Sequence, residues 1–153
     1  MEMKRFVVWV AAFSILALPV FAPAAEKGHG KEPVEKIFSG KAGPWTAEAR
    51  LVDMKAQMEK SGVSAKTAAK FAGQRHLMLF VTDPATGKAA AGVAGKVDVT
   101  GPDKASSSMV TLVVMGEHIG TDVGMPTPGK YTFEAEIESG AKKGSATFSY
   151  SLM

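Results

Sequence analysis

The segment GKYTFEAEIES, residues 129–139, alternates apolar and polar side chains without a break. Tyr131, Phe133, Ala135 and Ile137 occupy one set of alternate positions, and Thr132, Glu134, Glu136 and Glu138 occupy the other. Successive side chains of a β-strand point to opposite faces of a sheet, so this pattern predicts a strand with one buried face and one solvated face. This segment favours a β fold.

The same period of two recurs on both sides of this segment. Six further strands are predicted, at residues 45–52, 74–83, 95–100, 107–115, 118–125 and 145–153. About seven short strands joined by turns rich in glycine and proline predict an all-β fold, an immunoglobulin-like antiparallel β-sandwich. The approach PTPGKYTF also fits a late strand whose Tyr131 bonds back to the backbone at a corner.

A short helical insert is predicted after the first of these strands. Asp53 can cap the segment MKAQMEK, which Gly62 would end, and Ser64 can cap AKTAAKFA, which Gly73 would end. The insert is expected to lie over one side of the sandwich.

The amino-terminal part of the chain predicts export. Lys4 and Arg5 precede an apolar run over residues 6–18, and small residues at 22–24 fit a cleavage site. After cleavage the protein is expected in the periplasm without a stable membrane anchor. Three parts are predicted: a signal peptide over 1–24, a flexible tether rich in glycine over 25–43, and the sandwich domain over 44–153.

Charge and composition exclude several classes of function. The chain has 18 basic and 15 acidic residues, scattered along its length, so nucleic acid is not an expected partner. It has no cysteine, which excludes disulfides, thiolate zinc sites and blue-copper centres. Because no phosphate-binding loop, nucleophile elbow or H-E-x-x-H motif is present, the protein is not expected to be an enzyme.

Methionine and histidine remain as candidate metal ligands. Thioethers suit copper(I), and imidazole serves either copper oxidation state or zinc. The candidate ligands are Met54, Met58, His76, Met78, Met115 and His118. Plain core packing is the alternative for the methionines, which commonly fill gaps between other side chains, and solvent exposure is the alternative for a histidine in a turn.

The spacing of these candidates brings them together in pairs. Met54 and Met58 are four residues apart on the predicted helix, and His76 and Met78 share a strand face. Counting strand directions places Met54, Met58 and His76 at one end of the sandwich, and Met115 and His118, which flank the turn at 116–117, at the other. A single site would then require the insert to run the length of the domain.

Two runs resemble known families: HLMLFVTDPATGKAAAGVAGKVDVTGPD, residues 76–103, and LVVMGEHIGTDVGMPTPGKYTFEAEIE, residues 112–138. They are similar to the YtkA-like and FixH-like periplasmic immunoglobulin-fold proteins and, more distantly, to the CopC-type copper carriers. The resemblance covers about 74–150 and implies export, a sandwich fold and, in some relatives, copper handling by methionine and histidine. CopC-type proteins use a histidine at the mature amino terminus, whereas His29 would lie a few residues inside this chain.

Two functions remain open from the residues alone. The first is a periplasmic metal-binding protein, a copper carrier or chaperone that uses methionine and histidine ligands and exchanges the ion with a metal-transfer partner protein. The alternative is a non-catalytic immunoglobulin-like interaction module of the cell envelope that binds no metal.

Overall fold

The computed structural model describes residues 33–104 and 107–153, and these residues form an all-β domain with a few short helices. The strands are β1 (Val34–Ala42), β2 (Trp45–Asp53), β3 (Gln74–Thr82), β4 (Ala94–Thr100), β5 (Ser107–Met115), β6 (His118–Gly124), β7 (Gly129–Ser139) and β8 (Lys142–Leu152). The helices are α1 (Met54–Lys60), α2 (Ala65–Ala68) and the 3₁₀ helix η1 (Ala69–Phe71). None of these described helices is long and apolar enough to cross a membrane.

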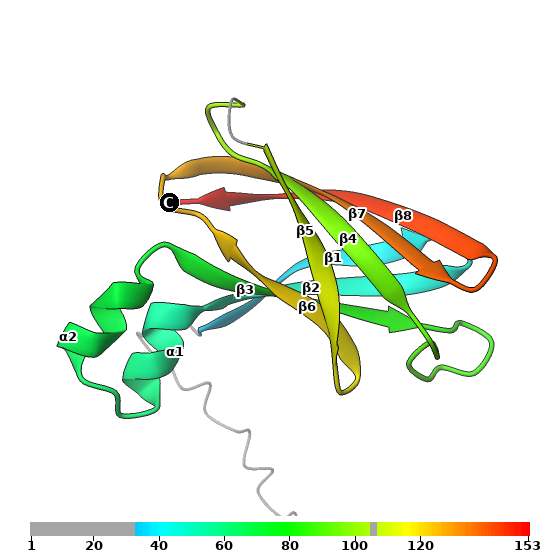
Figure 1. The fold of residues 1–153 in the computed structure, drawn as a ribbon, viewed down its shortest axis with the longest axis horizontal. Helices are drawn as coiled ribbons and strands as arrows, with labels where there is room; N and C mark the ends of the chain where they lie inside the picture. The colour runs from blue at the N-terminus through cyan, green and yellow to red at the C-terminus, as the bar shows by residue number, and fades with distance from the viewer. Residues whose placement is uncertain (1–32, 105–106) are drawn as a thin grey trace, which may run out of the picture. The chain divides into compact units, whose positions relative to one another are not determined.

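The strands follow the order β1-β2-β3-β6-β5-β4-β7-β8, and all neighbours are antiparallel (Figure 1). β5 links the two layers, because Ser107–Leu112 pair with β4 and Val113–Met115 pair with β6. One layer therefore contains β1, β2, β3 and β6, and the other contains β4, β7 and β8. This arrangement confirms the prediction of an antiparallel β-sandwich.

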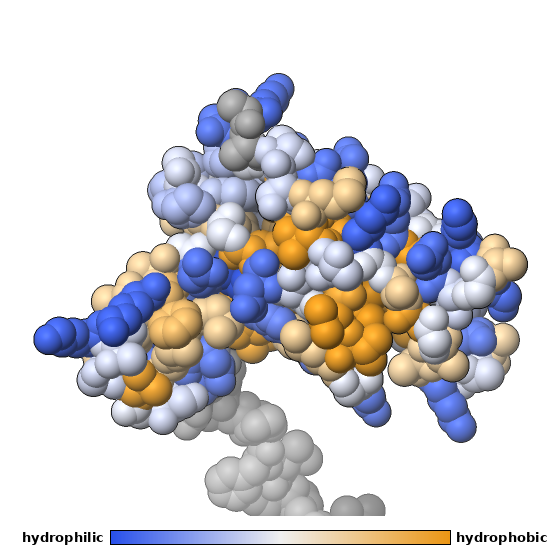
Figure 2. Space-filling model, viewed as in Figure 1, coloured by the Kyte–Doolittle hydropathy of each residue, from blue (hydrophilic) through white to orange (hydrophobic). Residues whose placement is uncertain are grey.

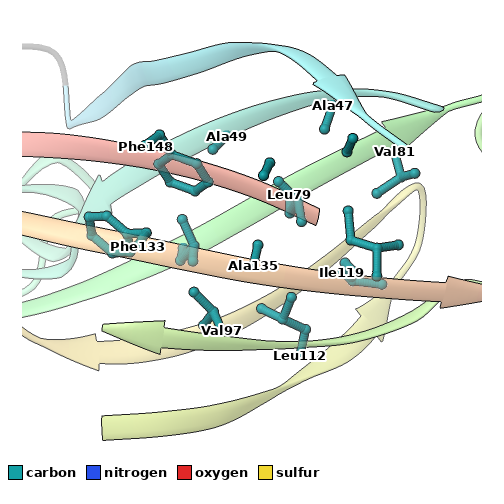
Figure 3. Close-up of a cluster of buried hydrophobic side chains, with 14 of the residues drawn as sticks. Ala47, Ala49, Leu79, Val81, Val97, Leu112, Ile119, Phe133, Ala135 and Phe148 are labelled. Carbon is teal, nitrogen blue, oxygen red and sulfur yellow. The ribbon is translucent and has the colours of Figure 1, made fainter. Parts of the chain in front are cut away.

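The core lies between the inner faces of the two layers. The four apolar side chains that alternate along β7 are all buried, as the sequence predicted. Phe133 stacks on Phe148 of β8 with ring centroids 5.3 Å apart (Figure 3). Phe148 in turn stacks on Phe38 of β1, with ring centroids 4.9 Å apart. Burying each such side chain contributes about 1.5–3 kcal/mol, so these rings help hold β1 against β8.

The predicted tether over 25–43 is wrong for its second half, because Val34–Ala42 form strand β1. The register of β1 against β2 shifts between Lys36 and Phe38, and this bulge breaks the alternation that marks other strands. Gly40 makes room for a ring: a Cβ there would lie 2.8 Å from Cζ of Phe38. The structure thus adds an eighth strand, while residues 1–32, including the predicted signal peptide, lie outside the described part of the chain.

Local hydrogen bonds confirm the predicted caps and corner. The backbone N–H of Ala56 donates to Asp53 at 3.1 Å, at the start of α1. The backbone N–H of Thr67 donates to Ser64 at the start of α2. Tyr131 donates its hydroxyl hydrogen to the carbonyl of Thr127 at 2.8 Å, which fixes the chain where it enters β7.

Candidate metal site

Side chains from three neighbouring strands lie together on the outer face of the first layer. Leu77, Leu79 and Ile119 point into the core, so the residues between them on β3 and β6 point outward. We call the outward set the outer array; it comprises His76, Met78 and Phe80 of β3, His118, Gly120 and Asp122 of β6, and Val113 and Met115 of β5. In register, His76 lies opposite Asp122 and Met78 lies opposite Gly120.

The two ring nitrogens of His76 have different surroundings. Its Nδ1 lies 2.7 Å from Oδ1 of Asp122, so in the neutral imidazole Nδ1 carries the hydrogen and donates it to the carboxylate. Its Nε2 lies over Gly120, where a Cβ would be only 3.0 Å away. The ring therefore lies along β6, from Asp122 toward His118, and Nε2 has no hydrogen-bond partner among the described residues.

His118 is the neighbour in that direction. Its ring centroid lies 6.2 Å from that of His76 and 5.2 Å from that of Phe80. The Nε2 atom of His118 is buried and has no hydrogen-bond partner among the described residues. Burial lowers the pKa of His118 below its ordinary value of 6.5, and the neighbouring His76 lowers this pKa further.

The burial of Nε2 of His118 without a hydrogen-bond partner among the described residues is energetically unfavourable. A buried polar atom without a partner costs about 1–3 kcal/mol, and native structures contain few of them. A neutral imidazole at such a position offers either a donor or a lone pair, and a lone pair is what a metal ion requires. The chemistry of His118 therefore fits a metal ligand.

Two methionines lie in register with residues next to the two histidines. Met78 lies directly opposite Gly120, over which the ring of His76 extends, and Met115 lies directly opposite His118. Directly opposed residues of antiparallel strands have Cβ atoms about 4.5–5.5 Å apart, which is within the reach of a methionine side chain. Met78 is partly buried, whereas Met115 is exposed at the rim of the array.

The structure divides the six sequence-predicted ligands into two groups. His76, Met78, Met115 and His118 share the outer array, whereas Met54 and Met58 are partly buried residues of α1. α1 begins beyond the last residue of β2, next to the ion pair of Asp53 and Arg75. These two methionines lie on a helix that contacts β2 and β3, and they are not among the strand residues that define the array.

The array also corrects the expected separation of the two histidines. They belong to opposite ends of β3 and β6, as the strand count predicted, but β3 and β6 are direct neighbours. Because the His76 ring extends along β6, it covers much of the distance to His118. A shared site needs no insert that spans the domain.

Asp122 and Gly120 were missed by the sequence reasoning. The spacing H-x-G-x-D over 118–122 places all three residues on one strand face, but it carries meaning only once β6 is known to pair with β3. Across the described ranges, no three histidine, aspartate or glutamate side chains gather into a metal-binding group.

Comparison with known proteins gives matches only at the level of structure. No family model and no curated protein matches this sequence, so the resemblance to the YtkA-like, FixH-like and CopC-type families stays a prediction. The domain is similar to copper-reconstituted P19 of Campylobacter jejuni, with a TM-score of 0.57 and 10% identity over 78% of this chain and 96% of P19. It is also similar to a copper-bound variant of FetP from uropathogenic Escherichia coli, with a TM-score of 0.56 and 15% identity over 78% of this chain and 92% of FetP. At these identities the likeness establishes a shared fold.

Proposed function

We propose that this protein binds copper(I) at the outer array and carries it outside the cytoplasm. The proposed ligands are His76, His118, Met78 and Met115. One observation carries the proposal: within the described part of the chain, the buried Nε2 of His118 has no hydrogen-bond partner, and a second imidazole without a partner on its own Nε2 lies beside it.

The donor set favours copper(I) over other ions. Thioethers are soft ligands that select copper(I), whereas magnesium and calcium prefer several oxygen ligands. The carboxylate nearest the histidines, that of Asp122, already accepts a hydrogen bond from His76. The fold shared with copper-bound P19 and FetP supports the same choice of metal.

A carrier also needs a route by which the ion enters and leaves. Met115 is 40% exposed at the edge of the array, so a partner's ligand can approach from that side. We propose binding and transfer rather than catalysis. The predicted signal peptide supports a periplasmic location.

Competition for copper(I) tests the proposal. The mature chain is titrated against a colorimetric copper(I) chelator under anaerobic, reducing conditions, together with Met78→Leu and Met115→Leu, which keep side-chain size and remove sulfur. Met109→Leu is the matched control, because Met109 is an exposed methionine on the same face of β5, six residues from Met115. We expect the wild type and Met109→Leu to withdraw copper(I) from the chelator, and both other variants to compete less well.

A wild-type chain that does not withdraw copper(I) from the chelator would favour the alternative function, an interaction module without metal. Four exposed large apolar side chains lie on β5, where Figure 2 shows an apolar patch; they are Met109, Val113, Val114 and Met115. Exposed apolar side chains that gather on one surface are also typical of protein–protein interaction sites. If the wild-type chain leaves the chelator fully loaded and excess copper(I) leaves its melting curve unchanged, the copper proposal is abandoned.

A further inference from the structure

We propose that Gly120 is a positioning residue of the outer array, because its missing side chain leaves the space in which the His76 ring lies. This inference concerns the unliganded chain first, and its consequence for copper(I) rests on the proposed function.

The backbone at this position does not require glycine. Eight glycines of the described residues have positive φ angles, and Gly120 is not one of them. Glycine in a strand interior is destabilising by about 0.5–1 kcal/mol relative to alanine and often marks a close approach of other atoms. Gly120 therefore needs an explanation other than its dihedral angles.

Two groups approach Gly120 closely, the backbone carbonyl of Leu77 and the ring of His76. A Cβ at Gly120 would lie 3.0 Å from Nε2 and 3.3 Å from Cε1 of that ring. Because Asp122 holds Nδ1 at the other end of the ring, the imidazole cannot slide along β6 to make room without breaking that hydrogen bond. A side chain at position 120 would instead lift Nε2 off the sheet and away from His118.

The backbone contact is the closer of the two, and the ring position must therefore be read out directly. The same Cβ would lie 2.8 Å from the carbonyl oxygen of Leu77, so Gly120→Ala also presses on β3. Gly124 supplies the matched control, since it lies on the same face of the same strand, four residues away, and a Cβ there meets nothing within 4 Å. Gly124→Ala thus adds the same methyl group without displacing a ring.

Nuclear magnetic resonance of the metal-free chain reads out the ring position directly. In the wild type we expect nuclear Overhauser contacts from the Cε1 hydrogen of His76 to the Hα atoms of Gly120. Ring nitrogen shifts should show hydrogen on Nδ1. Gly124→Ala should keep both signatures, and Gly120→Ala should lose the contacts while the remaining strand resonances stay in place. Absence of the contacts in the wild type overturns the inference without any variant, as does a folded Gly120→Ala that keeps its ring position.

The copper(I) titration then tests the role of Gly120 separately from the proposed function of copper(I) binding. We expect Gly120→Ala to weaken copper(I) binding by about tenfold or more, as loss of ligand orientation commonly does, and Gly124→Ala to leave it unchanged. Equal affinities of the two variants, with the ring displaced only in Gly120→Ala, would refute a role of Gly120 toward copper. If the wild type shows the expected ring contacts but does not bind copper(I), the proposed function is wrong. The positioning of the His76 ring by Gly120 would still be supported.

Discussion

Nδ1 of His76 lies 2.7 Å from Oδ1 of Asp122, although the two residues are 46 positions apart in the sequence. The Asp122 side chain is 66% exposed and that of His76 is 17% exposed. An exposed ion pair contributes little to stability, so this contact is more important for the orientation and tautomer of the ring than for the fold. It leaves Nε2 as the atom available to a ligand.

Replacing the carboxylate by an amide should therefore weaken metal binding with little effect on folding. In Asp122→Asn the amide NH₂ can donate to Nδ1, which favours the tautomer with hydrogen on Nε2 and blocks the proposed ligand atom. We expect copper(I) affinity to fall by about 10–100-fold in the chelator assay.

Asp98→Asn is the matched control for this substitution, because Asp98 lies on β4 and accepts a hydrogen bond from Ser107. The control should bind copper(I) as the wild type does. Similar affinities for both variants would show that Asp122 does not orient His76.

His118 should make stability depend on pH in a defined window. Its pKa in the folded protein is lowered, so the unfolded chain takes up the proton first as the pH falls below 6.5. This group's contribution to stability is therefore complete above that pH and is lost as the pH falls toward the lower, folded pKa. Urea unfolding of the wild type and His118→Gln between pH 7.5 and about 5 checks this, and the variant should lose less stability across the window. Parallel profiles would contradict it.

Phe38 should contribute to stability although its segment resembles a linker. Its ring stacks on Phe148 at 4.9 Å, so Phe38→Ala removes part of the contact between β1 and β8. We expect a loss of roughly 1–3 kcal/mol in the free energy of unfolding, below the cost for a fully buried ring. Lys36→Ala on the same strand removes an exposed side chain and should change stability by less than about 0.5 kcal/mol. Equal values would mean that β1 is only loosely attached.

The strands with an unbroken period of two could be predicted from local sequence alone. β7 shows this well, because each alternate residue meets the core and the pattern has no interruption. β1 could not be predicted in this way, since its bulge after Lys36 shifts the facing of later residues and Gly40 resembles a breaker. Its position depends on a ring contact with Phe148, more than a hundred residues away in the chain.

The candidate site was predictable as residue types and not as an arrangement. Methionine and histidine were singled out by their ligand chemistry, but their convergence depends on the pairing of β3 with β6, which no local pattern reveals. Asp122 and Gly120 carry no signal of their own. They gain their roles only because the ring of His76 lies across them.

Two hairpin glycines test how closely the β1–β2 turn approaches β8. Gly43 follows β1 and Gly140 follows β7, each as the first residue of a two-residue turn, with φ angles of 61° and 60°. A Cβ at Gly43 would lie 2.6 Å from the Cα of Gly144, whereas one at Gly140 meets nothing within 4 Å. Alanine should therefore cost about 1–2 kcal/mol at both positions through the left-handed backbone, and roughly 1–3 kcal/mol more at Gly43 through displacement of β8.

Urea denaturation of Gly43→Ala and Gly140→Ala measures this difference directly, because the backbone penalty is common to both variants. Unequal m-values would indicate a change in the folded or unfolded ensemble, so the comparison holds when the slopes agree. A Gly43→Ala variant as stable as Gly140→Ala would mean that the turn does not press against β8. The contact at Gly144 would then be too loose to fix the edge of the sandwich opposite the outer array.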